Sequence, residues 1–317
     1  MIRPKEKNAD GKIYSPIEGT ELIIVKKENR YIYMVFENKE LKDLEIENCN
    51  ELPVGTRFAG KVDSLSPQIN AAYILMPDKN RAFLKNAPKD LKCESVIPVE
   101  IKRSSSKGKL ASVSITDDDI EHKTVFSIIS YGKRTFEKLF GEYSFERVLT
   151  DEDKLYSEII QYNSANESMD ETKIILYRDS MVSLGVLYSV TKRLEESTSK
   201  TIWLKSGANI FIENTNAFTV IDVNSAKNDK KGENSYLKIN KEAAREIFRQ
   251  MNIRNLSGII LVDFINMTGE EEKDLLDYMN KLCKDQKKYT KVVDITPLGI
   301  AEITRKKEGP TLGDICI

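Results

Sequence analysis

The fold is decided by a stretch that reads FTVIDVNS at residues 218–225 and NKEAAREIFRQMNIRNLSGIILVDFIN at residues 240–266. Each part contains a short apolar run that ends in an aspartate, which is typical of a strand. Between the two runs, apolar residues recur at helical spacing, and Asn240 is a suitable N-cap. Gly258 then ends the helical segment. The pattern predicts a strand, a helix and a second strand.

The residues around this stretch continue the alternation of strands and helices. Residues 209–224 predict a hairpin that turns at 214–216. Thr268 and Glu271 form a capping-box pattern at the start of a second helix. A last strand is predicted at residues 291–299, which read KVVDITPLG.

Two aspartates, Asp222 and Asp263, lie in the otherwise apolar strands. An ionised carboxylate in such a strand is costly unless it is paired or binds a metal ion. Because side chains alternate along a strand, Asn224 shares one face with Asp222. If the two strands are neighbours, two carboxylates and an amide converge, and oxygen ligands of this kind suit Mg²⁺. The pattern alone fits equally well with buried aspartates that only accept hydrogen bonds from loop amides.

Composition limits the chemistry that the chain can perform. Its 317 residues include 49 Lys and Arg against 50 Asp and Glu, so the net charge is −1 and any basic surface must be local. His122 is the single histidine and the four cysteines are scattered, which disfavours histidine-based triads, zinc clusters and a disulfide framework. The sequence shows no signal peptide and no apolar run of roughly 20 residues, so we expect a cytoplasmic protein.

The first two thirds of the chain carry different patterns. Residues 21–48 predict a meander of three strands, and residues 55–115 predict five short strands that are typical of a small OB-like barrel. Residues 146–162 and 183–200 are amphipathic and predict two helices, with a short buried strand at 173–177. A β-rich part therefore precedes the part in which strands and helices alternate.

Three blocks of the chain occur in a fixed order: IDVNS, NKEAAREIFRQMNIRNLSGIILVDFINM and TPLGIAEITRKKEGPTLGD. Their residues, order and spacing closely resemble the catalytic region of the ribonuclease E/G family. The resemblance implies an α+β and α/β composite, in which an RNase H-like subdomain with an inserted OB-fold β-barrel precedes a DNase I-like catalytic subdomain. The implied parts are a flexible leader at 1–19, the split RNase H-like subdomain at 20–48 and 118–200, the RNA-binding insert at 49–117 and the catalytic subdomain at 201–317.

The resemblance also assigns roles to the acidic residues. It implies that Asp222 and Asp263 bind a catalytic Mg²⁺ ion and that Asn224 orients Asp263 by a hydrogen bond. The implied activity is endonucleolytic hydrolysis of single-stranded RNA, such as mRNA or rRNA precursors, in RNA processing or decay. The metal would activate a water molecule and stabilise charge on the phosphate. The expected products carry 5′-phosphate and 3′-hydroxyl ends.

Further residues are marked by the resemblance for contact with RNA. Tyr73 and Phe83 fall at base-stacking positions of the barrel, and Lys107 falls at a basic position that contacts RNA. Aromatic rings beside cations are the usual means of binding single strands. Arg305 and Lys306, in the basic TRKK segment, are expected to contact phosphate. The alternatives are that the rings fill the barrel core and that the basic run is only solvated.

Three departures from the family narrow these expectations. A VRTAG-like block, which senses a 5′-monophosphate in longer members, is absent between Ser114 and Phe145. Cys316 lacks the second cysteine of the family's CPxC zinc-link, so no zinc-linked dimer is expected. Asn266 stands where the family has the second aspartate of its IDFID block, and we expect little effect from this change.

Two other functions remain open on the sequence. The first is a non-catalytic RNA-binding protein, which would bind RNA tightly without metal-dependent cleavage. The second is a ribosome or rRNA maturation factor that uses the barrel alone, for which alanine at both aspartates would leave the cellular function intact. The intact acidic pair favours the endoribonuclease over the first of these.

Overall fold

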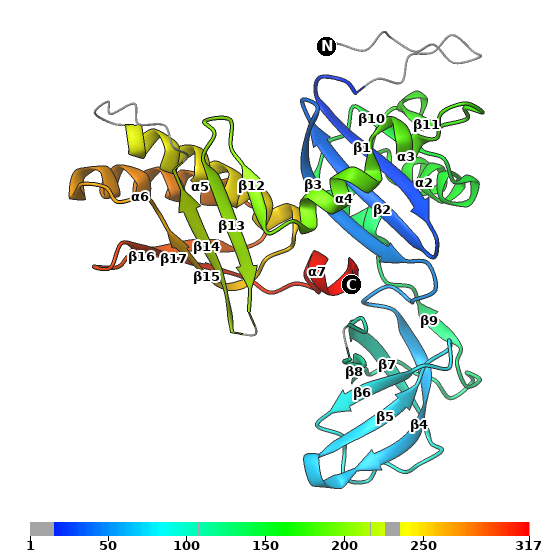
Figure 1. The fold of residues 1–317 in the computed structure, drawn as a ribbon. Coiled ribbons are helices and arrows are strands. Elements are labelled where there is room, and N and C mark those ends of the chain that lie inside the picture. The colour runs from blue at the N-terminus through cyan, green and yellow to red at the C-terminus, as the bar shows by residue number, and fades with distance from the viewer. Residues whose placement is uncertain (1–15, 107, 216, 226–234, 317) are drawn as a thin grey trace.

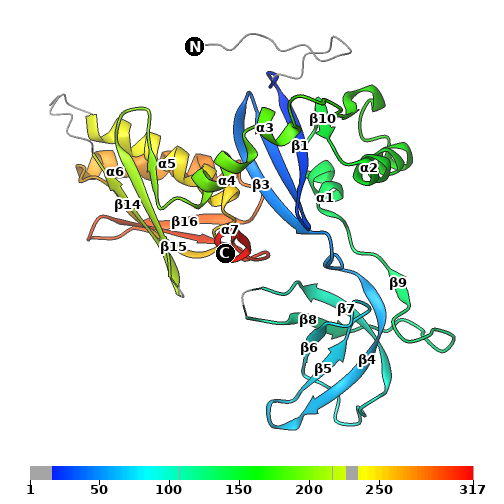
Figure 2. The ribbon, with the colours of Figure 1, turned by 45° about the vertical axis from the view of Figure 1, so that its right-hand side comes forward.

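The computed structural model is a mixed α+β structure with three sheets, which form three bodies in Figure 1. Figure 2 shows that the barrel is joined to the first sheet by two chain segments, 49–56 and 131–134. Most of the predicted leader and Lys107 lie outside the described residues. No helix in the described part of the chain is long and apolar enough to cross a membrane. The structure describes residues 16–106, 108–215, 217–225 and 235–316.

The first sheet consists of β1 (Thr20–Lys27), β2 (Arg30–Glu37), β3 (Glu40–Asn48), β10 (Arg147–Thr150) and β11 (Ile174–Leu176). The strand order is β11-β10-β1-β2-β3, and the first three strands of the chain form the predicted antiparallel meander. β10 pairs in parallel with β1, and β11 pairs in parallel with β10. One face is covered by α1 (Thr135–Glu142) and α2 (Asp153–Asn166), and the other by α3 (Leu184–Leu187) and α4 (Val190–Thr198).

Two predicted helices are shorter than their sequence patterns indicated. β10 occupies the first part of the segment 146–162, because its backbone pairs with β1 and its Arg147 bonds to Glu21 at 2.7 Å in the interior. In the segment 183–200, Ser189 adopts a left-handed conformation with a φ of 50°, which separates α3 from α4. The first difference arises from contacts with residues far away in the sequence.

The second sheet closes on itself as an OB-like barrel of five strands. These are β4 (Arg57–Ser66), β5 (Ala71–Leu75), β6 (Arg81–Lys85), β7 (Val96–Arg103) and β8 (Ala111–Ile115). The order β5-β6-β8-β7-β4 is closed by pairing of β5 with β4, and β9 (Ile128–Ser130) extends the sheet beside β4. Its interior holds alternate apolar side chains such as Phe58, Ile74 and Leu84. The predicted five-stranded barrel is confirmed.

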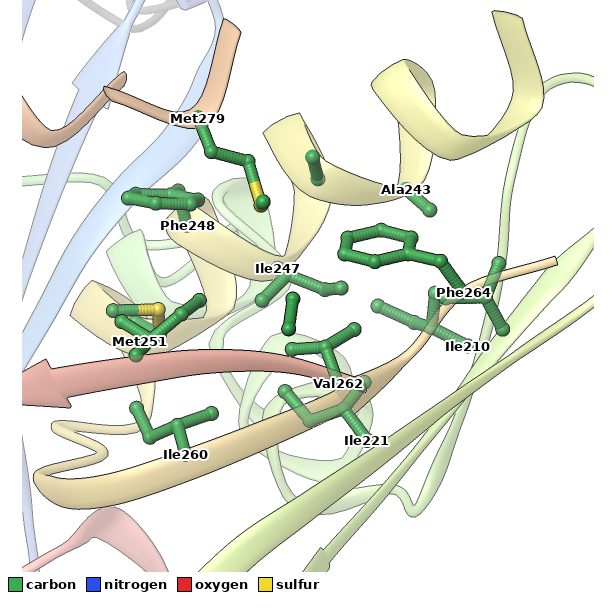
Figure 3. Close-up of a cluster of buried hydrophobic side chains, with 14 of the residues drawn as sticks. Ile210, Ile221, Ala243, Ile247, Phe248, Met251, Ile260, Val262, Phe264 and Met279 are labelled. Atoms are coloured by element: carbon green, nitrogen blue, oxygen red, sulfur yellow. The ribbon is translucent and has the colours of Figure 1, made fainter. Parts of the chain in front are cut away.

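The third sheet contains the strands that carry the two aspartates. It consists of β12 (Thr201–Trp203), β13 (Asn209–Asn214), β14 (Phe218–Asn224), β15 (Gly258–Asp263), β16 (Thr290–Ile295) and β17 (Ile300–Arg305). The order is β12-β13-β14-β15-β17-β16. Two helices, α5 (Ser235–Ile253) and α6 (Gly269–Lys284), pack on one face, and Figure 3 shows Ile247 of α5 between the helix and Val262 of β15.

The third sheet and its helices differ in some details from the elements that the sequence predicted. β17 is an additional strand, which lies between β15 and β16. α5 begins before Asn240, so this residue does not cap the helix; its buried amide instead bonds to the main chain of Ile265 at 2.7 and 3.2 Å. The capping box of Thr268 and Glu271 is confirmed. The β13–β14 hairpin is confirmed as well, although Asn216 of its turn lies outside the described residues.

The third sheet is attached to the first through α5 and the segment that follows β17. Ile253 of α5 is buried in the core of the first sheet, and so is Leu312 of the short helix α7 (Leu312–Cys316). Arg249 of α5 donates a hydrogen bond to the carbonyl of Leu41 at 2.8 Å. Apolar and polar contacts together therefore fix this junction.

Candidate functional site

Asp222 and Asp263 are direct neighbours across the parallel pairing of β14 with β15. Neighbouring strands lie about 4.8 Å apart, and paired residues point to the same face of the sheet. Ile221 and Val262, which alternate with the aspartates, are buried beneath the helices. Both carboxylates therefore point to the opposite face, where Asp222 is half-buried and Asp263 is exposed. This exposure argues against the alternative of two core aspartates.

Asn224 contacts a different aspartate from the one expected. Its side-chain amide donates a hydrogen bond to Oδ2 of Asp222 at 2.8 Å, and not to Asp263. The reason is strand geometry, because residues two apart on β14 lie on the same face and within reach of each other. In this structure Asn224 therefore orients Asp222.

Tyr73 and Phe83, the two predicted stacking residues, lie side by side on the barrel. They are paired across β5 and β6, and their ring centroids are 5.9 Å apart in an edge-to-face arrangement. Both side chains are half-buried, whereas Ile74 and Leu84 point inward and are fully buried. The rings therefore belong to the outer surface of the barrel, and the alternative that they fill its core does not hold.

Arg103 extends this surface, although the sequence did not single it out. Ser64, Tyr73, Phe83 and Ser112 form one row across four strands of the barrel, and Arg103 is the next residue of the row on β7. Simple alternation along VEIKR would place Arg103 inside the barrel. A β-bulge before it shifts the register, so its side chain is exposed beside the row. Two rings and a cation thus share one face, as in many single-strand binding sites.

Comparison with known proteins assigns the family. The sequence model of the ribonuclease E/G family matches residues 109–308, which is more than half of the chain. The chain belongs to this family. A ribonuclease E from Synechocystis sp. is 36% identical over 138 residues, covering 42% of this chain and 20% of that protein. Ribonuclease G from Haemophilus influenzae is 32% identical over 175 residues, covering 53% of this chain and 35% of that protein.

A third relative of the ribonuclease E/G family shows the same partial coverage. A ribonuclease E/G-like protein from Pyropia yezoensis is 33% identical over 153 residues, covering 47% of this chain and 30% of that protein. This chain therefore spans about a third or less of the length of the three relatives.

The acidic pair of this ribonuclease E/G family member fits Mg²⁺ by the chemistry of its donors. Mg²⁺ is usually held by one or two carboxylates while it keeps several water molecules. Asp222 and Asp263 supply such carboxylates from one exposed face. Within the described ranges, no group of three or more His, Cys, Asp or Glu side chains is placed to hold a metal ion. A two-carboxylate site with oxygen ligands suits Mg²⁺ better than Zn²⁺, for which Cys and His ligands are typical.

Arg305, which was predicted to contact RNA, has a structural role instead. Its side chain is buried, and the guanidinium donates to the carbonyls of Met251 at 3.0 Å and Leu256 at 2.6 Å, and to Oδ1 of Asn252 at 2.6 Å. Met251 lies in the last turn of α5 and Leu256 in the segment that follows it, so Arg305 ties the end of the helix to the start of β15. Burial also lowers the pKa of Arg305 below its ordinary value. The prediction was wrong because β17 continues through Arg305 and points its side chain inward.

Lys306, the second basic residue of this segment, remains accessible. Its side chain is 64% exposed, and its ammonium lies 2.7 Å from the carboxylate of Glu308. An exposed ion pair of this kind contributes little to stability, so Lys306 can exchange Glu308 for a phosphate. The RNA contacts of Lys306 and of Lys107, which lies outside the described residues, stay predictions.

Proposed function

We propose that this protein is an endoribonuclease that hydrolyses internal phosphodiester bonds of single-stranded RNA with Mg²⁺ held by Asp222 and Asp263. The observation that carries the proposal is the register of β14 with β15, which sets the two carboxylates side by side on an uncovered sheet face. Two like charges at this distance repel each other, and a divalent cation between them relieves the repulsion. Membership of the ribonuclease E/G family and relatives named ribonuclease E and ribonuclease G support the same activity in RNA processing.

Each residue of the proposed site has a separate role in the reaction. Asp222 and Asp263 supply the oxygen ligands, and Asn224 holds the carboxylate of Asp222 in one orientation. When bound, Mg²⁺ stabilises the charge that develops on the phosphate. Hydrolysis adds the oxygen of a water molecule to phosphorus and breaks the bond from phosphorus to the 3′ oxygen. The products are a 5′-phosphate on one fragment and a 3′-hydroxyl on the other.

In this proposal the barrel binds the RNA. Tyr73 and Phe83 stack on bases, and Arg103, Lys107 and Lys306 contact phosphates. Stacking of a base on an aromatic side chain contributes roughly 1–3 kcal/mol, so two rings give substantial affinity without a fixed sequence. The proposed substrate is therefore single-stranded RNA, because a duplex hides the faces of its bases.

We also infer the identity of the subdomains. The first sheet is RNase H-like, formed by 20–48 and the later segment to 200, and the part from 201 onward is the DNase I-like catalytic subdomain. Support for the first assignment comes from the three antiparallel strands, the two parallel strands beside β1, and helices on both faces. Because β9 pairs with β4, we infer that the barrel insert extends beyond 117 to about Ser130. The cytoplasmic location and the lack of a zinc-linked dimer stay predictions.

A cleavage assay on a fluorescent single-stranded RNA, with Mg²⁺ and with EDTA, tests the proposed function. We expect cleavage only with Mg²⁺, and a loss of at least about 100-fold for Asp222→Asn and Asp263→Asn, because each removes a charged ligand. Asp277→Asn, an exposed change on α6, is the matched control and should keep full activity. Equal cleavage by wild type and Asp222→Asn would refute the assignment. Tight RNA binding without any cleavage would support the non-catalytic alternative.

A further inference from the structure

The face of the third sheet opposite α5 and α6 exposes several large apolar side chains in addition to the acidic pair. Its outward side chains include Trp203, which is 69% exposed, and Ile259, which is 53% exposed. Large apolar side chains that gather on one exposed face usually mark a binding surface. We call this surface the open face, and its apolar members are Trp203, Phe211, Phe218, Val220 and Ile259.

The register places two aromatic residues of the open face next to the acidic pair. Phe211 of β13 is the direct partner of Asp222, on the side away from Asp263. Trp203 of the edge strand β12 partners Asn209, which in turn partners Asn224. With strands about 4.8 Å apart and residues about 3.4 Å apart along them, the backbones of Trp203 and Asp222 are separated by about 12 Å. Both rings are therefore within reach of nucleotides adjoining a phosphate held at the acidic pair.

Lys200 supplies a positive charge beside one of the two rings, that of Phe211. The ammonium of Lys200 lies 5.8 Å from the centroid of the Phe211 ring and 2.6 Å from the carboxylate of Glu213. The side chains of Lys200 and Glu213 are 62% and 51% exposed, so their ion pair is weak in water. Lys200 can therefore turn from Glu213 to a phosphate at small cost.

We propose that Trp203 and Phe211 form a base-stacking platform for single-stranded RNA beside the cleavage site, with Lys200 as its phosphate contact. The inference rests on the proposed function, which identifies the polymer, and it adds a second RNA-binding surface to that of the barrel. Aromatic rings on an exposed sheet face, with a cation next to them, provide the stacking and charge that single strands need.

A second copy of the chain fits the open face less well than RNA does. In a twofold dimer the same patch meets itself, so like charges come together. The middle of the open face carries Asp222 and Asp263 in one row, and the next row adds Glu213 and Glu302. Glu213 is paired with Lys200, but such a dimer would still bring Asp222, Asp263 and Glu302 of one copy against the same carboxylates of the other. RNA avoids this repulsion. Its uncharged bases stack on the rings, and the divalent ion lies between its phosphate and the acidic pair.

Trp203 is the only tryptophan of the chain, which gives a direct measurement. We expect a single-stranded oligoribonucleotide to quench its fluorescence, in EDTA so that the RNA stays intact. A base-paired duplex of the same sequence should quench it much less, because its bases are already stacked. Unchanged fluorescence at RNA concentrations that saturate binding would overturn the platform.

Affinity measurements on variants complete the test, by fluorescence anisotropy of a labelled single strand in EDTA. Trp203→Leu and Phe211→Leu should each weaken binding roughly 5- to 100-fold, and Trp203→Phe should retain most of the affinity. Tyr289→Leu is the matched control, because Tyr289 is also 69% exposed but lies beside β16 at the opposite edge of the sheet. Equal weakening by Trp203→Leu and Tyr289→Leu would overturn the proposal. So would conversion of a dimer to a monomer by Trp203→Leu with RNA affinity unchanged.

The outcomes separate this inference from the proposed function. Cleavage that needs Asp222, together with unchanged RNA affinity in Trp203→Leu, would refute the platform and leave the nuclease intact. Quenching of Trp203 by single strands, together with no cleavage under any metal condition, would refute the nuclease and leave the platform intact.

Discussion

The guanidinium of Arg305 donates a hydrogen bond to the main-chain carbonyl of Leu256 at 2.6 Å. The same group also reaches Met251 and Asn252, so one buried side chain joins the end of β17 to the end of α5. Because β17 pairs with β15, Arg305 helps to fix the strand that carries Asp263 to the helix behind it. Arg305, which was expected to contact RNA, therefore stabilises the strand that carries Asp263.

Arg305→Ala should lower the free energy of unfolding by about 3 kcal/mol, because it removes three hydrogen bonds of a buried guanidinium and leaves the buried carbonyl of Leu256 without this donor. Urea denaturation measures this change. Lys306→Ala, one residue further on and exposed, should change the stability by less than about 0.5 kcal/mol and is the control. A stable Arg305→Ala protein that binds RNA more weakly would restore the original prediction.

Asn224→Ala should weaken the apparent affinity for Mg²⁺ about 10- to 100-fold, because Asp222 loses the hydrogen bond that orients it. Titration of cleavage activity with Mg²⁺ measures the shift, and high Mg²⁺ should restore much of the rate. Ser225→Ala, at the next and also exposed position, is the control. If Asn224→Ala cleaves like wild type at every Mg²⁺ concentration, the orienting role is refuted.

Tyr73→Ala and Phe83→Ala should each reduce affinity for single-stranded RNA roughly 5- to 100-fold, because each removes one stacking surface. Filter binding or anisotropy measures the loss. Tyr73→Phe keeps the ring and should bind almost normally. Leu65→Ala, an exposed apolar change on the same barrel, should have no effect. If Leu65→Ala reduced the RNA affinity as much as Phe83→Ala does, the proposed RNA-binding role of the row across the barrel would be refuted.

Stability should also fall as the pH rises from about 5 to about 8, because of Glu45 at the junction of the first and third sheets. Burial of its carboxyl at the junction, although the side chain as a whole is 38% exposed, and then the neighbouring carboxyl of Asp43 raise the pKa of Glu45 from its ordinary value of 4.5 to about 7. The folded state therefore binds a proton that the unfolded state has already released above pH 4.5. This contribution is present at low pH and is lost as the pH rises through 7.

Lys288, which lies 3.8 Å from Glu45, opposes this shift in the pKa but does not cancel it. Urea denaturation over a pH series measures the effect. Glu45→Gln should flatten the dependence in this range, whereas Glu195→Gln, an exposed change on α4, should leave it unchanged. An unaltered slope in Glu45→Gln would show that other groups at the junction set the pH dependence.

Local periodicity explains the parts of the fold that the sequence predicted. The meander of β1, β2 and β3, the five barrel strands and the capping box at Thr268 all depend on residues close together in the chain. The same alternation placed Asp222 and Asn224 on one face of their strand. The sequence could not show that Arg103 points out of the barrel, because a single β-bulge reverses the side that alternation predicts.

Predictions from local sequence patterns were wrong where a partner distant in the sequence determines the structure. Arg147 lies in a strand because β1 pairs with it, and Asn240 lies inside α5 because its amide bonds to Ile265 beyond β15. Arg305 was predicted to contact phosphate, but its acceptors on Met251 and Asn252 of α5 lie more than 50 positions earlier in the chain. Each of these residues is satisfied by groups that the local sequence does not contain.

By itself, the sequence determined which residues are able to form the site: two aspartates at the ends of apolar strands, and two rings in a barrel. Only the tertiary structure decided that Asp222 is the direct neighbour of Asp263 and that Phe211 lies next to Asp222. The physical reason is that strand period is a local property, whereas strand pairing depends on how helices and sheets pack across the whole domain.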